Sequence, residues 1–254
     1  MPSLPDPQFL TVGQGSSTRE IAYRRIDGSR PTIVWLGGFK SDMKGTKAQA
    51  LADHAAATGR AYLRFDYSGH GESPGRFEQG TITRWAEEAT AVIALAGPAP
   101  ILVGSSMGGW IALLVARRLA RPAGGMVLIA PAADFTEALM WKAFPDAVKR
   151  QIEVEGRWVR PSAYETDGYP ITRELIEDGR NNLVLGGLIE TGCPVHVLQG
   201  MQDPDVPWQH AMDMVARIAR DDVVVTLIKD GDHRLSRPED LTRLTDAVTA
   251  MAGG

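Results

Sequence analysis

The sequence contains a single cysteine and no long hydrophobic run. Cys193 has no second cysteine to pair with, so the fold cannot use an intramolecular disulfide and does not need an oxidising compartment. Its place before an apolar run is typical of a small buried residue. No stretch approaches the roughly 18 consecutive apolar residues of a membrane-spanning helix. Residues 1–7 also lack the basic and then apolar order of a targeting segment. We therefore expect a cytoplasmic protein with no membrane span.

The sequence also lacks basic clusters and the common metal and phosphate motifs. Its 27 Lys and Arg residues are outnumbered by 31 Asp and Glu residues, which gives a formal net charge of −4. No Lys/Arg run predicts the basic patch that nucleic acids favour. There is no Cys/His cluster, no His-Glu-x-x-His, no Gly-x-x-x-x-Gly-Lys-Ser/Thr loop and no Gly-x-Gly-x-x-Gly after an early strand. We expect no nucleic-acid partner, no metal and no organic cofactor.

What the sequence does contain is a regular alternation of short apolar runs with longer stretches of helical period. The 254 residues, 44% of them hydrophobic, are enough to bury the core of a single domain over residues 1–254. The alternation is typical of βαβ units around a mostly parallel sheet, so we predict an α/β fold. The predicted strands are 18–25, 32–36, 60–65, 101–103, 126–129, 195–198 and 222–228. The predicted helices are 46–58, 82–95, 110–119 and 238–251.

One stretch, residues 131–192, departs from this alternation. It is longer than a crossover between parallel strands requires, and it contains helical fragments with several aromatic residues. We predict that it forms a helical cap over the carboxyl ends of the strands. Its aromatic residues include Trp141, Phe144, Trp158, Tyr164 and Tyr169. Trp141 and Trp158, together with Trp208 further along the chain, either line an apolar acyl pocket or belong to the ordinary core.

The pentapeptide Gly104-Ser105-Ser106-Met107-Gly108 lies between a predicted buried strand and a predicted apolar helix. Gly-x-Ser-x-Gly at such a junction is typical of a sharp turn that strains the serine backbone, and larger residues at the two glycine positions would collide. The serine oxygen then projects at the N-terminus of the following helix, where the helix dipole and free N–H groups favour negative charge. Only Ser106 has glycines at both positions, so we predict that it is a nucleophile.

A serine hydroxyl needs a base to remove its proton, and the sequence offers five histidines. His233 follows the last predicted strand and precedes the last predicted helix. This places it on a loop at the carboxyl end of the sheet, where ligands gather in open α/β sheets. We predict that His233 is the base. The other four are expected to be packing, surface or loop-shaping residues: His54, His70, His196 and His210.

Several segments together resemble the α/β-hydrolase superfamily. Besides the Gly-x-Ser-x-Gly turn, Asp66-Tyr67-Ser68-Gly69-His70-Gly71-Glu72-Ser73 is similar to the superfamily's Asp-x-x-Gly-x-Gly-x-Ser loop. With Asp205-Val206-Pro207-Trp208 and Asp230-Gly231-Asp232-His233-Arg234, the resemblance narrows to a family of mitochondrial mycophenolic acid acyl-glucuronide esterases and palmitoyl-protein thioesterases with bacterial relatives. It implies an α/β-hydrolase fold and the hydrolysis of acyl esters or thioesters.

In this superfamily the acidic member of the triad follows a strand between the serine and the histidine. The loop after residues 195–198 carries two candidates, Asp203 and Asp205. The resemblance favours Asp203, which occupies the Gly-x-x-Asp position, and Asp205 is the alternative. The acid would accept the second N–H of the histidine and stabilise the imidazolium. Two backbone N–H groups should hold the oxyanion, that of Met107 and that of Phe39 in the loop after residues 32–36.

These residues predict a two-step acyl transfer on a small-molecule or acyl-protein substrate. Two alternatives keep the same fold: a ligand-binding receptor of low turnover, and a cofactor-free peroxidase or C–C hydrolase that uses the same three residue types. A haloalkane dehalogenase is disfavoured, because a serine stands where its aspartate nucleophile would be needed.

Overall fold

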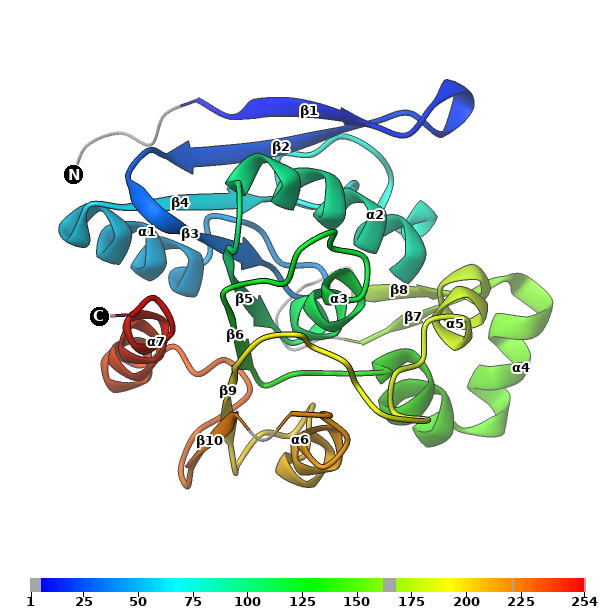
Figure 1. Ribbon diagram of the computed structural model, residues 1–254. Coiled ribbons are helices and arrows are strands. Elements are labelled where there is room, and N and C mark those ends of the chain that lie inside the picture. Colours follow the sequence, from blue (N-terminus) through cyan, green and yellow to red (C-terminus); the bar gives the residue numbers. More distant parts are fainter. Residues whose placement is uncertain (1–5, 162–167, 221, 254) are drawn as a thin grey trace.

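The computed structural model describes residues 6–161, 168–220 and 222–253, so Tyr164 of the predicted cap lies outside the described residues. Within these ranges, eight strands form a central sheet in the order β1-β2-β4-β3-β5-β6-β9-β10 (Figure 1). β2 is antiparallel to both β1 and β4, and all other neighbours are parallel. The strands are β1 Gln8–Val12, β2 Arg19–Ile26, β3 Ser29–Leu36, β4 Arg60–Phe65, β5 Ile101–Ser105, β6 Gly125–Ile129, β9 Val195–Gly200 and β10 Val223–Ile228.

Helices cover both faces of the sheet because the central strands are apolar on both sides. Successive side chains of a strand point to opposite faces. Ile33 and Trp35 of β3 therefore pack with α1 and α7, while Val34 and Leu36 pack with α2 and α3 on the other face. The covering helices are α1 Thr46–Thr58, α2 Ile82–Ile93, α3 Met107–Ala116, α6 Trp208–Val215 and α7 Pro238–Met251.

The predicted α/β class and the mostly parallel sheet are confirmed, with differences at the edges of elements. The sequence does not predict β1, a strand of five residues that gains its order by pairing with β2 at the edge of the sheet. Helix α3 begins at Met107 rather than at residue 110. Two glycines in its first turn lower the helix propensity there, yet a close approach to β3 requires one of them.

The segment between β6 and β9 contains helices and also a strand hairpin, which the sequence does not predict. Arg160 at the end of β7 forms an ion pair with Asp205 (3.7 Å). The Tyr169 ring at the start of β8 packs against Phe39, with 6.3 Å between ring centroids. The hairpin therefore lies over the loops that follow β9 and β3, at the carboxyl end of the sheet. The elements of this segment are a π-helical turn at Thr136–Met140, a short helix at Trp141–Ala143, α4 Asp146–Glu155, β7 Arg157–Arg160, β8 Tyr169–Thr172 and α5 Arg173–Arg180.

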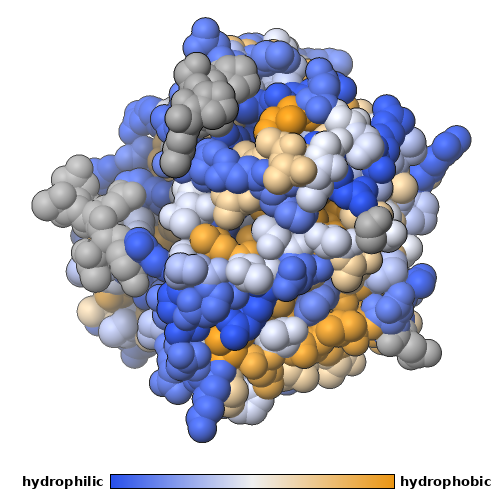
Figure 2. All heavy atoms as spheres, turned by 90° about the vertical axis from the view of Figure 1, so that its left-hand side faces the viewer, coloured by the Kyte–Doolittle hydropathy of each residue, from blue (hydrophilic) through white to orange (hydrophobic). Residues whose placement is uncertain are grey.

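The outer surface is mixed in polarity. On the side that carries α1 and α7, polar residues cover most of the upper part and an apolar area lies in the lower part (Figure 2). Strand β10 ends the sheet and leaves Val224 and Leu227 about half exposed. In the described part of the chain, no helix combines the length and apolar character needed to cross a bilayer.

Candidate active site

The turn between β5 and α3 places Ser106 in a strained backbone conformation. Ser106 alone joins strand to helix, with φ 54° and ψ −117°. A Cβ atom on Gly108 would lie 2.1 Å from the carbonyl oxygen of Leu36, and one on Gly104 would lie 2.5 Å from the carbonyl oxygen of Gly108. Both positions therefore require glycine. Strain of this kind is concentrated at functional sites.

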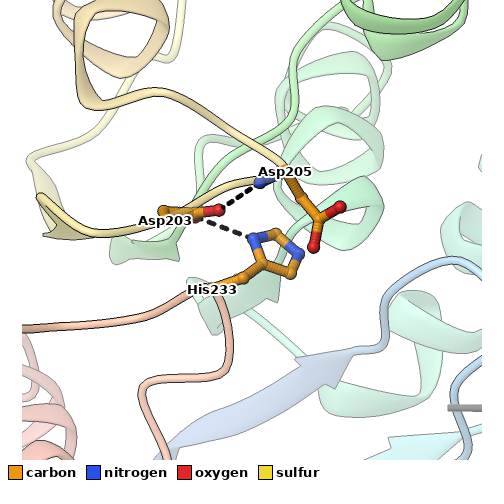
Figure 3. A group of neighbouring side chains, drawn as sticks. All are labelled: Asp203, Asp205 and His233. Atoms are coloured by element: carbon orange, nitrogen blue, oxygen red, sulfur yellow. Dashed lines mark hydrogen bonds and ion pairs between the residues drawn. The ribbon is translucent and has the colours of Figure 1, made fainter. Parts of the chain in front are cut away.

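Three side chains from distant parts of the sequence form a hydrogen-bonded chain at this turn. The Nε2 atom of His233 lies 3.1 Å from Oγ of Ser106. Its Nδ1 atom lies 2.8 Å from Oδ2 of Asp203, the contact drawn in Figure 3. Because a carboxylate only accepts, Nδ1 carries the proton and Nε2 is left to accept from the serine hydroxyl. The Asp203 side chain is fully buried, whereas His233 is about a quarter exposed. The structure thus brings all three predicted residues together.

Backbone hydrogen bonds explain why Asp203, and not Asp205, reaches the histidine. Oδ1 of Asp203 accepts the N–H groups of Asp205 (2.9 Å) and Val206 (2.8 Å), which turns the carboxylate into the loop. The amide of Gln199, itself buried in β9, donates to Oδ2 (3.3 Å). Asp205 lies beside the histidine ring (Figure 3), but its carboxylate forms the ion pair with Arg160 in the hairpin.

Asp203, Asp205 and His233 each offer one atom that could bind a metal, and these atoms lie within 4.8 Å of one another. Two of them, however, already satisfy each other at 2.8 Å. A cation between them would have to take the place of the proton that Nδ1 donates. The second oxygen of Asp203 is occupied by two backbone N–H groups. This donor set fits a hydrogen-bonded Asp–His pair better than a metal centre.

The loop that carries His233 is held at several points after β10 ends. Asp232 accepts the N–H of Leu235 (2.9 Å), which closes the loop just after the histidine. The ammonium group of Lys47, on α1, donates to the carbonyl oxygen of Arg234. Burial lowers the pKa of Lys47 to about 8. These contacts fix the imidazole from the side of the loop and from the neighbouring helix.

The two predicted oxyanion donors lie on either side of the serine. Met107 is the first residue of α3, so its N–H is among those that a helix leaves unsatisfied at its start. The loop after β3 passes close to the turn, since a Cβ on Gly38 would lie 3.5 Å from Cβ of Ser106. Within residues 6–161, 168–220 and 222–253, the N–H groups of Phe39 and Met107 have no hydrogen-bond acceptor. Both are therefore available to a bound ligand.

Two of the predicted pocket residues, Trp141 and Trp158, pack against other side chains of the cap. Trp158 packs on Phe144 in the cap (5.2 Å between centroids), and the ring of Trp141 is covered by the Arg180 guanidinium at 4.8 Å. Both contact the apolar core, and Trp208 begins α6. Their place in a substrate pocket stays a prediction.

The sequence does not predict the aromatic cluster around Phe39, because the residues of this cluster are far apart in the chain. They meet where the loops after β3, β4 and β6 come together with α2 and β8. The rings that surround Phe39, with centroid distances of 4.9 to 6.3 Å, are Phe77, Trp85, Phe135 and Tyr169. Their apolar surface lies beside the predicted oxyanion donor.

A mostly parallel sheet with a serine at a strand–helix turn, followed by an aspartate and a histidine on later loops, defines the α/β-hydrolase class. Residues 33–244 match the Alpha/beta hydrolase family, and the chain belongs to that family. The fold predicted from the resemblance is thereby confirmed.

Both protein sequences and solved structures similar to this chain point to a smaller group within the family. The human palmitoyl-protein thioesterase ABHD10, mitochondrial, is 37% identical over 232 residues, which cover 90% of this chain and 75% of that protein. The solved structure of mouse alpha/beta hydrolase domain-containing protein 10 has 34% identity and a TM-score of 0.86, over 97% of this chain and 98% of that one. A protein from Agrobacterium vitis S4 has 50% identity and a TM-score of 0.94, over 97% and 98%. These findings confirm the predicted family resemblance.

Proposed function

We propose that the chain is a serine hydrolase that cleaves carboxylic ester or thioester bonds, with Ser106 as nucleophile, His233 as general base and Asp203 orienting the histidine. The observation that carries this proposal is the continuous chain of hydrogen bonds from Oγ of Ser106 through His233 to Asp203. A strained turn holds the hydroxyl at the N-terminus of a helix, which suits a group that must attack a carbonyl and leave an anion nearby.

The proposed reaction proceeds in two steps. His233 takes the hydroxyl proton on Nε2 as Oγ attacks the acyl carbonyl, and the buried carboxylate of Asp203 stabilises the imidazolium. The N–H groups of Met107 and Phe39 bind the oxyanion, and the protonated imidazole then gives its proton to the leaving alcohol or thiol. Water, activated by the same imidazole, hydrolyses the acyl-enzyme and frees Ser106.

The proposed substrates are acyl esters or thioesters of small molecules or proteins. The ABHD10 relatives are palmitoyl-protein thioesterases by name, which supports thioester chemistry. The rings around Phe39 offer apolar surface beside the reacting carbonyl, which fits an apolar acyl group.

A fluorophosphonate probe tests the nucleophile directly. It should label the wild-type chain and fail to label Ser106→Ala, whereas Ser105→Ala, the matched control one residue away, should still react. Ser106→Ala should also lower kcat by about 10⁵- to 10⁶-fold, as for other triad serines. Labelling that survives Ser106→Ala would refute the assignment.

The substrate class is tested with p-nitrophenyl esters of graded acyl length beside an acyl-CoA thioester. Turnover that depends on acyl length supports the proposal. Labelling of Ser106 without turnover of any compound would instead favour a ligand-binding receptor of low turnover.

A further inference from the structure

The proposed mechanism leaves one part of the sequence without a role, the glycine-rich loop that follows β4. Its conformation is fixed by close packing. A Cβ on Gly69 would lie 2.7 Å from the backbone nitrogen of Phe77, and one on Gly71 would lie 2.1 Å from Oδ2 of Asp66; both glycines have positive φ. Between them, His70 is directed inward and is only 4% exposed.

This loop is hydrogen-bonded to the neighbouring loop that carries Phe39. Residues 38–41 form a turn, closed by the Ser41 N–H, which donates to the Gly38 carbonyl oxygen (3.1 Å). Lys40 within the turn has φ 55°, a conformation that is unfavourable for a residue other than glycine. A rotation of the peptide between Phe39 and Lys40 would relieve this strain. Some other contact must therefore hold the turn as it is.

His70 supplies that contact. Its Nε2 atom lies 3.1 Å from the backbone nitrogen of Lys40, and its Nδ1 atom lies 3.3 Å from the carbonyl oxygen of Ser68. A backbone N–H can only donate and a carbonyl can only accept, so the ring is neutral, with its proton on Nδ1. Burial lowers the pKa of His70 to about 4, which agrees with a neutral ring at pH 7.

The setting of His70 leaves its ring little freedom to move. The rings of Tyr67, Phe77 and Trp85 surround it, with centroids at 5.1 to 5.7 Å. Further along the loop that carries Phe39, the N–H of Met43 donates to Asp66 (2.6 Å). The glycine-rich loop is therefore hydrogen-bonded to its neighbour at two points, Lys40 and Met43.

We propose that His70 is a positioning residue for the oxyanion site: its Nε2 atom accepts the Lys40 N–H, holds the strained turn at residues 38–41, and so keeps the Phe39 N–H aimed at the carbonyl attacked by Ser106. The inference rests on the proposed function. The proposed role depends on Nε2 as a hydrogen-bond acceptor, because a side chain that only filled the space would not favour one orientation of the Lys40 peptide group.

The test compares His70→Gln with His70→Met, two side chains of similar length and volume. Glutamine keeps an acceptor that can reach the Lys40 N–H, and methionine does not. With a p-nitrophenyl ester, His70→Met should lower kcat by about 10- to 100-fold, below the full loss of an oxyanion donor. KM should stay within about twofold of wild type, because the oxyanion site acts on the transition state. His70→Gln should recover activity to within about threefold of wild type, because it restores the acceptor.

A second measurement separates positioning from simple damage. A trifluoromethyl ketone forms an oxyanion adduct with a reactive serine. Its inhibition constant should therefore rise in His70→Met by about the same factor by which kcat falls. His196→Met, the same substitution in β9 near the end remote from the Asp203 loop, serves as the matched control and should leave both constants unchanged. Melting curves establish that each variant is folded.

The outcomes distinguish this inference from the proposed function. Wild-type activity with an equally active His70→Met would overturn the role of His70 alone. So would equal impairment of the Met and Gln variants, or a change confined to KM. A wild-type chain that neither reacts with fluorophosphonate nor hydrolyses esters would overturn the proposed function itself.

Discussion

Acid should destabilise this protein through His70, and the effect can be isolated by replacing that residue. In the folded chain burial lowers the pKa of His70 from 6.5 to about 4. Between these pH values the unfolded chain binds the proton and the folded chain does not. The free energy of unfolding therefore falls as the pH falls below about 6.5, and the loss is complete below about 4.

The size of the effect follows from the two pKa values. The full difference corresponds to about 3 kcal/mol, and the part lost between pH 7 and pH 5 to about 2 kcal/mol. This is a substantial fraction of the roughly 5–15 kcal/mol by which most domains are stable. Burial also raises the pKa values of Asp66 and Glu88. Their protonation favours the folded chain in acid and opposes the effect of His70.

Urea unfolding followed by circular dichroism at pH 7, 6 and 5 measures the effect, for wild type and for His70→Gln. The absolute stability of the variant does not matter, because the comparison is of slopes: the buried carboxyl groups contribute to both proteins. The free energy of unfolding should fall by about 2 kcal/mol more in wild type than in the variant between pH 7 and pH 5. Parallel pH dependences would refute the claim that His70 is held neutral by burial.

Asp203→Asn should lower kcat by about 10⁴-fold, whereas Asp205→Asn, which breaks a part-exposed ion pair, should change it by less than about tenfold. Steady-state ester hydrolysis compares the two, and the reverse order would move the acid to Asp205. Gly108→Ala should melt well below wild type or fail to fold, because its Cβ would lie 2.1 Å from a strand carbonyl oxygen. Gly186→Ala is the control and should melt like wild type, since a Cβ there would have nothing within 4 Å. Equal melting temperatures of the two variants would contradict the close approach at Gly108. Cys193 is 2% exposed and burial raises its pKa to about 11, so a thiol reagent should modify it only after unfolding, and rapid reaction of the native chain would show that the thiol is accessible.

The parts of the site that could be predicted from the sequence are those fixed by local constraints. The turn at Ser106 needs glycine two residues before and two after, a strand on one side and a helix on the other, and all of these appear in one short stretch. His233 can also be predicted from the sequence, because a loop between the last strand and the last helix reaches the carboxyl end of the sheet whatever the details of packing. The Ser106 prediction rests on a short local pattern, and the His233 prediction rests on the order of elements along the chain.

The choice between Asp203 and Asp205 needed more than local pattern. Both carboxylates lie on one loop, two residues apart, and composition does not distinguish them. The difference is made by two backbone N–H groups and the amide of Gln199, which direct one carboxylate inward. The resemblance to a known family supplied what the spacing could not.

The hairpin of β7 and β8 shows a second limit of the sequence. Each strand has four residues, too few for a clear alternation, and the hairpin gains its order from contacts with distant loops. One such contact is between the rings of Tyr169 and Phe39, two residues that are far apart in the sequence. The aromatic cluster and the ion pair to the Asp203 loop could not be foreseen, because they exist only once the sheet has formed.

The order in which the sheet is threaded has a consequence for how the protein is made. The hydroxyl of Ser106 is set in its turn by β5 and α3, whereas the proposed base, His233, lies 127 residues further along the chain, in the stretch that joins β10 to α7. A ribosome-bound chain that lacks this stretch carries the serine without its imidazole. The proposed reactivity should therefore appear only after β10 has docked on β9 and placed His233 beside the serine, and a chain truncated before β10 should remain inert toward acyl groups.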